Sequence, residues 1–311
     1  MRARRLAVAG MTATILAMAP RVASAHVPLE GGATDAVGLV EVGAVLLLLG
    51  ASAACYAKGV GRLWRHAGRG RGVGRAQVAC FWAGLAVLGV ALLGPMVWPV
   101  TEDFSGHMAQ HLLLLVVAAP LLAWSDPLLV AAWAVRDTSA RPLLVGWSAV
   151  ARWRVTRLLV AGPVVLAVYA GVVWAWHLPV LYDAAVRHDG WHALEHVTMA
   201  LAALLFWGRV RWLAARRPAQ QVVAAALLFA AMFPDLVLGA FLAFASTPLY
   251  EAHRTVSVTG LAPLVDQQLG GLLMLMVGGM AYLGVALALM LRLLNQPASE
   301  ARLHPSTGGR R

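Results

Sequence analysis

Seven long apolar stretches run through this 311-residue chain, and each approaches the roughly 20 residues that a helix needs to cross a bilayer. The third is long and contains Pro120 and Asp126-Pro127, so we expect it to kink or end there. Because helices satisfy their own backbone hydrogen bonds in lipid, we predict an all-α polytopic membrane helix bundle of about seven transmembrane helices. The stretches lie near Ala36–Tyr56, Ala76–Trp98, His107–Val135, Leu158–Trp176, Trp191–Val210, Gln220–Phe244 and Gln267–Leu291.

Composition supports a lipid environment and argues against a nucleic-acid partner. Hydrophobic residues make up 60% of the chain and charged residues only 13%, against about 25% charged residues in soluble domains. The net charge of +11 sits in short clusters between the apolar stretches. Basic clusters beside membrane spans indicate orientation in the bilayer, not binding to DNA.

The N-terminus resembles a secretory signal. A basic start is followed by the apolar segment Leu6–Met18 and by Ala23-Ser24-Ala25, a small-x-small pattern typical of a cleavage site. We therefore predict a signal peptide over residues 1–25, with an uncleaved anchor helix as the alternative. A seven-helix membrane domain over 26–296 and a disordered cytoplasmic tail over 297–311 would follow.

Basic residues occur in alternate connections between the spans. The first, third and fifth connections and the C-terminal tail are rich in arginine, whereas the second has none, the fourth only Arg187 and the sixth only Arg254. By the positive-inside rule, this pattern places the N-terminus outside and the C-terminus in the cytoplasm.

Eight of the ten histidines then fall at the non-cytoplasmic end. His107 and His111 are spaced i, i+4 and so share one helical face, and His192 and His196 repeat this spacing on another helix, with Glu195 beside them. Single histidines at a membrane boundary often only cap helices. Two such pairs with a carboxylate at similar depth favour a metal site, because imidazole binds copper, zinc or iron.

Other side chains extend this candidate site. His177 ends the fourth stretch and is counted with the metal ligands, whereas five residues are possible accessory ligands: Asp266, Met108, His253, Asp235 and His26. Thioether sulfur favours Cu(I), although methionine in a membrane helix is more often plain packing. After cleavage at Ala25, the amine and imidazole of His26 could chelate Cu(II) together.

No enzyme motif competes strongly with this interpretation. His192-Ala-Leu-Glu-His196 matches the H-x-x-E-H string of inverzincin peptidases, but the chain has no soluble catalytic domain around it. We find no nucleotide motif and no nucleophile triad, so we expect no enzymatic activity.

Several motifs, in order, resemble the CtaG family of bacterial assembly factors for caa3-type cytochrome c oxidase. The matching segments are Ser105–Leu113, Ala119–Leu122, Trp176–Ala184, His192–His196, Phe206–Trp207, Asp266–Gly271 and Met274. The resemblance implies a plasma-membrane protein that helps to mature the copper-containing oxidase at the copper stage, without catalysis. It also implies oxidase subunits or copper chaperones as partners.

Two other functions stay open at the level of the sequence. A copper transporter would continue its ligands through the bilayer, using Asp235 and the methionines Met274, Met276 and Met280 of the last stretch. A b-type haem protein would use histidines from facing helices as axial ligands.

Overall fold

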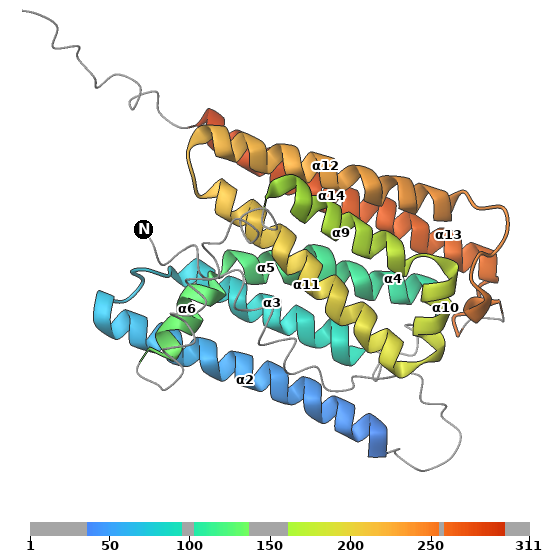
Figure 1. Ribbon diagram of the computed structural model, residues 1–311, viewed down its shortest axis with the longest axis horizontal. Coiled ribbons are helices and arrows are strands. Elements are labelled where there is room, and N and C mark those ends of the chain that lie inside the picture. The colour runs from blue at the N-terminus through green and yellow to red at the C-terminus, as the bar shows by residue number, and fades with distance from the viewer. Residues whose placement is uncertain (1–35, 95–102, 137–160, 255–257, 296–311) are drawn as a thin grey trace, which may run out of the picture.

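The computed structural model describes residues 36–94, 103–136, 161–254 and 258–295. These residues form helices, and none of them forms a strand. Six helical segments are long and apolar enough to cross a membrane, and the count reaches seven if one bent pair of helices is a single span. The predicted all-α polytopic bundle is therefore confirmed (Figure 1).

The described helices are named here in chain order. The first half of the described chain contains α2 (Ala36–Ala67), α3 (Arg75–Leu93), α4 (Phe104–Leu112), the π-helix η4 (Leu113–Ala118), α5 (Ala119–Trp124) and α6 (Pro127–Ala134). The second half contains α9 (Gly162–Trp176), α10 (Pro179–Arg187), α11 (Asp189–Ala214), α12 (Pro218–Ala243), the 3-10 turn η5 (Glu251–His253), α13 (Pro263–Leu273), the π-helix η6 (Met274–Gly278) and α14 (Gly279–Leu294).

Some spans differ in length from the apolar stretches. Helix α2 continues to Ala67, well past the expected end at Tyr56, so Lys58 and Arg62 lie on a helix and not in a loop. The fourth span is broken, since α9 has only 15 residues and α10 follows at an angle of 68°. The predicted signal segment 1–25, His26 and the tail 297–311 lie outside the described residues.

The third span ends where the sequence predicted a break. Asp126 adopts a left-handed backbone conformation with φ of 50°, and Pro127 then opens the separate helix α6. The Asp126 carboxylate accepts hydrogen bonds from the side chains of Gln77 on α3, at 2.6 Å, and Arg211 on α11, at 3.0 Å. A single turn residue thus connects three spans at this end of the bundle.

The bend between α9 and α10 has a local cause. Pro179 disfavours helical geometry at the residue before it, and Leu178 adopts φ of −66° and ψ of 130°. The chain leaves α9 at His177 and starts again with Pro179 in the first turn of α10, where a missing N–H costs nothing. His177 is therefore held at a corner, where its ring is buried.

Helix α11 lies in the middle of the bundle and packs against α9, α5, α12 and α10 (Figure 1). Its Trp207 is fully buried and donates a hydrogen bond of 2.8 Å to the carbonyl of Leu115. Leu115 lies in η4, where the wider π-helical turn leaves a carbonyl for this bond. The same π-helix begins two residues after His111, so it helps to fix the face that His111 presents.

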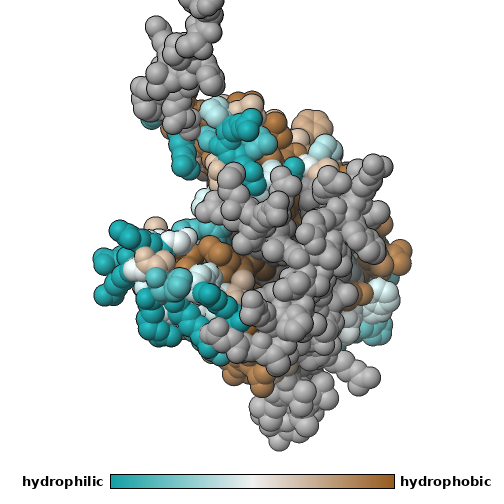
Figure 2. Space-filling model, turned by 60° about the vertical axis from the view of Figure 1, so that its left-hand side comes forward, coloured by the Kyte–Doolittle hydropathy of each residue, from teal (hydrophilic) through white to brown (hydrophobic). Residues whose placement is uncertain are grey.

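The two ends of the bundle differ in chemistry. One end, here called the arginine end, carries the exposed arginines Arg65, Arg69, Arg71, Arg75 and Arg217, and Figure 2 shows hydrophilic surface on both sides of an apolar band there. The other, here called the histidine end, carries the start of α4, α10, the start of α11 and the start of α13 (Figure 1).

Candidate metal centre

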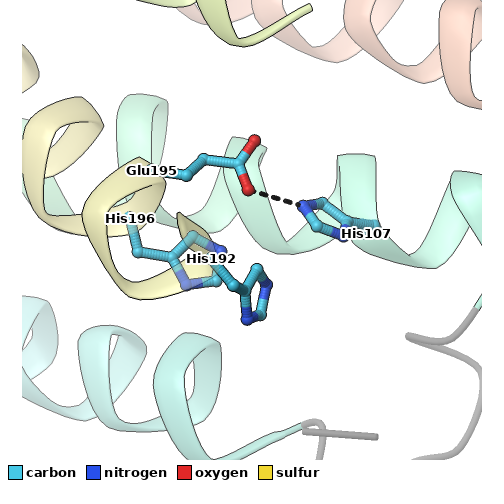
Figure 3. Close-up of side chains that lie close together, drawn as sticks. All are labelled: His107, His192, Glu195 and His196. Atoms are coloured by element: carbon cyan, nitrogen blue, oxygen red, sulfur yellow. Dashed lines mark ion pairs between the residues drawn. The ribbon is translucent and has the colours of Figure 1, made fainter. Parts of the chain in front are cut away.

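Two helices bring four potential ligands together at the histidine end. Helix α4 contributes His107, and α11 contributes His192, Glu195 and His196 (Figure 3). One ligand atom from each of the four lies within 4.8 Å of the others, and all four side chains are buried. His107 of the first i, i+4 pair thus lies beside both histidines of the second pair.

His111 belongs to the same cluster from the side of α4. Its Nε2 lies 2.9 Å from the Nε2 of His107, within hydrogen-bond distance, and 3.6 Å from a carboxylate oxygen of Glu195. The His107 Nε2 lies 3.5 Å from the other oxygen of Glu195 (Figure 3). Glu195 therefore places one carboxylate oxygen near each of the two α4 imidazoles.

Several polar atoms in this cluster have no hydrogen-bond partner among the described residues. They are both carboxylate oxygens of Glu195, Nε2 of His196 and Nδ1 of His111. Glu195 is 0% exposed. Leaving a buried carboxylate without donors costs several kcal/mol, and native proteins rarely do so without a reason. Lone pairs that converge in this way fit a bound cation with nitrogen and oxygen ligands.

His177 lies next to the cluster but outside the group of four. Its ring is 6.1 Å from the ring of His111, and its Nδ1 donates a hydrogen bond of 2.7 Å to the carbonyl of Val173. Its Nε2 lies 3.3 Å from the sulfur of Met108. The sequence predicted both residues near the site, and the structure places them against each other.

Asp266 stabilises the start of α4. Its two carboxylate oxygens accept hydrogen bonds from the backbone N–H groups of Phe104, at 2.7 Å, and Ser105, at 3.1 Å. These are donors that a helix N-terminus leaves unpaired. Asp266 thus anchors the turn that presents His107, whereas its suggested part as an accessory ligand stays a prediction.

His253 is linked to the cluster through Tyr182. Its Nε2 is 2.9 Å from the hydroxyl of Tyr182, and the Tyr182 ring packs 5.4 Å from the ring of His107. Tyr250 donates a hydrogen bond of 3.0 Å to the backbone carbonyl of His177. Burial, with the charges of Asp183 and Glu195, raises the pKa of Tyr250 well above its ordinary value, so this hydroxyl stays a donor at physiological pH.

Asp235 lies in a separate buried network. The hydroxyl of Tyr282 donates to its carboxylate at 2.8 Å, and Tyr169 and Tyr282 share a hydrogen bond of 2.5 Å. The structure does not bring Asp235 together with the histidines. Of the last-span methionines, Met276 and Met280 are 48% and 71% exposed and face away from the bundle interior, whereas Met274 is buried.

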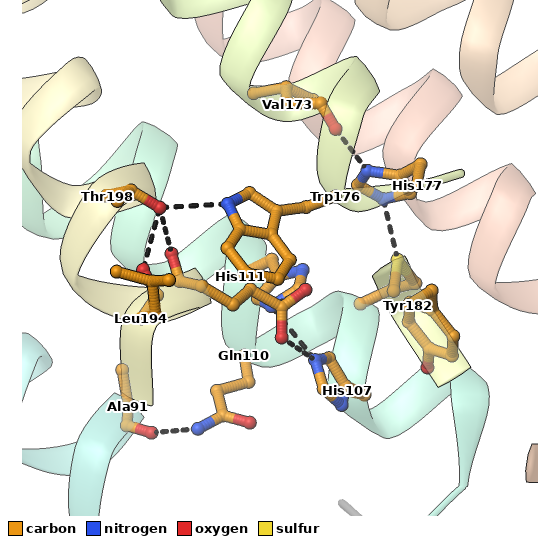
Figure 4. A network of polar contacts seen from close by, with 12 residues as sticks. Ala91, His107, Gln110, His111, Val173, Trp176, His177, Tyr182, Leu194 and Thr198 are labelled. Carbon is orange, nitrogen blue, oxygen red and sulfur yellow. Dashed lines mark hydrogen bonds and ion pairs between the residues drawn. The ribbon is translucent and has the colours of Figure 1, made fainter. Parts of the chain in front are cut away.

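Sequence reasoning missed two tyrosines and one glutamine. Tyr282 is the hydrogen-bond partner of Asp235, and Tyr169 is the partner of Tyr282. Gln110 donates a hydrogen bond of 2.7 Å to the carbonyl of Ala91 beside the cluster (Figure 4). Gln110 had a detectable signal, since it is an amide in an apolar span, one position before His111. The tyrosines had none, because their partners lie 47 and 113 residues away along the chain.

A comparison with known proteins finds a protein-family match for this chain. A family model described as cytochrome c oxidase caa3 assembly factor matches residues 54–296. This range spans most of the chain and includes every residue of the cluster. No curated protein and no solved structure matches the chain.

Proposed function

Because this chain belongs to the family of caa3 cytochrome c oxidase assembly factors, we propose that it supplies copper to the oxidase through its histidine cluster. The observation that carries the proposal is the convergence of His107, His192, Glu195 and His196 within 4.8 Å. Copper suits this donor set, because imidazole is a good ligand for it and the carboxylate offsets its charge. The protein acts as a metal carrier for a partner enzyme, without catalysis of its own.

The proposal includes the side of the membrane. The arginine end carries the basic connections, which the positive-inside rule assigns to the cytoplasm of a bacterial plasma membrane. The histidine cluster then faces outward, where oxidase subunits or copper chaperones could exchange copper with it.

The cluster favours a single ion over a haem. Its rings are packed closely, with centroids of His107 and His192 only 5.2 Å apart and those of His192 and His196 4.3 Å apart. A porphyrin between axial histidines would need an open plane, and neighbouring rings and Glu195 occupy that space. A Soret band in the purified protein would instead support haem binding.

A deletion and two double variants test the function. Deleting the protein should lower cytochrome oxidase activity while the oxidase subunits are still made. His107→Ala/His111→Ala and His192→Ala/His196→Ala should reproduce this loss and should lower the copper content of the purified protein. Added copper should partly restore a weakened site, because occupancy rises with ligand concentration.

The matched control is His188→Ala, because His188 is exposed at the same end of the bundle. It should leave copper content and oxidase activity unchanged. Copper-replete oxidase in both double variants, at wild-type protein level, would refute the copper-supply function.

A further inference from the structure

Met108 and His177 form a buried pair beside the histidine cluster. Met108 is 0% exposed and His177 5% exposed, and the His177 Nε2 lies 3.3 Å from the Met108 sulfur. This contact joins α4 to the corner between α9 and α10. Figure 4 draws the hydrogen bond that the other ring nitrogen of His177 donates to Val173. The two residues of this pair are 69 positions apart in the sequence.

The hydrogen bond to Val173 determines which His177 nitrogen carries the proton. A carbonyl oxygen can only accept, so the Nδ1 at 2.7 Å from it holds the N–H. In a neutral imidazole the Nε2 is then an acceptor with a lone pair. A thioether has no proton to donate either. Two electron-pair donors therefore face each other at hydrogen-bond distance, with no hydrogen between them.

A cation between the two donors resolves this conflict. Imidazole nitrogen with thioether sulfur is a soft donor set, typical of Cu(I). His111 offers a further donor, since its ring lies 6.1 Å from that of His177 and its Nδ1 has no hydrogen-bond partner among the described residues. Because the nitrogen and the sulfur lie close together, both would bind the ion from one side, with a bent nitrogen–metal–sulfur angle. This arrangement leaves room for a third ligand.

We propose that His177 Nε2 and Met108 Sδ, with His111 beside them, form a second and softer position that holds a monovalent soft ion such as Cu(I). This inference rests on the proposed function and deepens it. The position lies next to the harder cluster of His107, His192, Glu195 and His196, and His111 lies between the two, with its Nε2 2.9 Å from that of His107. Copper could therefore move between the two positions without crossing apolar core.

The surrounding chain holds both side chains of the pair in place. A Cβ at Gly270 of α13 would lie 3.1 Å from the Met108 Cγ and 2.5 Å from a ring carbon of Phe104, so only glycine leaves room for them. On the other side, the Tyr250 hydroxyl binds the carbonyl of His177. Rigid support of this kind is what a binding position needs to keep its ligands in register.

X-ray absorption spectroscopy of the full-length, detergent-purified protein loaded with one equivalent of Cu(I) tests the proposal directly. The wild type should show a sulfur neighbour in the copper coordination shell. Met108→Leu should lose this neighbour and bind Cu(I) at least about tenfold more weakly, with a smaller effect on Cu(II). His177→Asn should lose it too, because asparagine can still donate to Val173 but offers no nitrogen lone pair.

The matched control is Met199→Leu. Met199 is 1% exposed, as buried as Met108, and lies on α11 near the cluster. Its replacement should leave the sulfur signal unchanged.

The possible results separate this inference from the proposed function. A copper shell of nitrogen and oxygen alone in the wild type would overturn the soft position and leave the copper-supply function standing. A sulfur signal that persists in Met108→Leu would also overturn it. A wild-type protein that takes up no copper would overturn both. The wild-type spectrum decides the question even if a variant folds poorly, which thermal unfolding of each variant would reveal.

Discussion

At the scale of single residues, Glu195 is the side chain of the cluster whose burial costs the most free energy when no cation is bound. It is 0% exposed, and neither carboxylate oxygen has a hydrogen-bond donor among the described residues. The nearest partners are two imidazoles at 3.5 and 3.6 Å. A buried carboxylate in these surroundings is costly for folding and useful for binding a positive ion.

Glu195→Gln should therefore separate binding from stability. The amide removes the negative charge, so copper affinity should fall at least about tenfold. The metal-free protein should unfold at the same or a higher temperature, because a neutral amide is cheaper to bury. Copper titration and thermal unfolding in detergent measure the two effects.

The control for this variant is Glu251→Gln. Glu251 is exposed and only forms a surface ion pair with Arg187, so its replacement should change neither quantity appreciably. Unchanged copper affinity in Glu195→Gln would contradict a direct part for this carboxylate.

At the scale of helices, the start of α4 depends on a residue from another span. Asp266 of α13 accepts from the backbone N–H groups of Phe104 and Ser105, and Asp103 accepts from the backbone N–H groups of Val258 and Thr259. These two carboxylates join the beginning of α4 to the segment around α13. His107 follows within one helical turn, so the joint determines its position.

Asp266→Asn should weaken this joint measurably. Asparagine has one acceptor oxygen in place of two, so one of the two backbone bonds is lost, at a cost of about 1 kcal/mol. Copper affinity should fall as well, because the first turn of α4 carries His107. Asp189→Asn, in the first turn of α11, is the control. Equal unfolding temperatures and copper affinities in the two variants would refute the anchoring role.

Helices α12 and α13 approach each other so closely that position 271 has room only for glycine. A Cβ at Gly271 would lie 2.5 Å from the backbone nitrogen of Ala243 and 2.8 Å from the carbonyl oxygen of Gly239. Backbone atoms cannot move aside as a flexible side chain can. This contact and the neighbouring Gly270 hold α13 against α12 and α4.

Gly271→Ala should lower the free energy of unfolding by about 1–3 kcal/mol, as overpacking does in a close-packed core. Gly284→Ala on α14 is the matched control, because a Cβ there has nothing within 4 Å. It should be neutral or slightly stabilising, since alanine favours a helix more than glycine does. Similar unfolding temperatures for the two variants would show that the helices can separate without cost.

At the scale of the whole molecule, most of the described arginines lie at one end of the bundle and most of the described histidines lie at the other. The arginine end carries Arg69 and Arg71 in the turn between α2 and α3, and the histidine end carries Asp183 on α10. Between them, large apolar side chains such as Phe233 and Phe241 are 68% and 63% exposed on α12. This apolar surface suits a lipid environment.

Labelling in intact cells should establish the orientation. In a variant with Cys55 and Cys80 replaced by serine, Asp183→Cys should react with an impermeant thiol reagent. Arg69→Cys should react only after the membrane is permeabilised, because the positive-inside rule places its turn in the cytoplasm. The reverse pattern would put the histidine cluster in the cytoplasm and overturn supply from outside.

Local features of this protein follow directly from the order of its amino acids. Apolar length predicted the spans, and Asp126-Pro127 predicted the end of the third, because both depend on the chemistry of neighbouring residues. Spacing of i, i+4 placed His107 with His111 and His192 with His196, because a helix repeats every 3.6 residues. The fourth stretch was predicted to end at Trp176, and α9 ends there, but the sequence did not predict the short helix α10 that follows at an angle of 68°.

Which of these helix faces meet depends on how the helices pack in three dimensions. From the sequence, His177 was predicted as a ligand of the metal site, and Met108, Asp235 and Asp266 as possible accessory ligands. Packing places Met108 against His177, Asp266 at the start of α4, and Asp235 against Tyr282. Their partners lie 69, 162 and 47 residues away along the chain. Helical periodicity determines the face on which a side chain lies, whereas its partner depends on how the helices pack, which close contacts such as Gly239 with Gly271 determine.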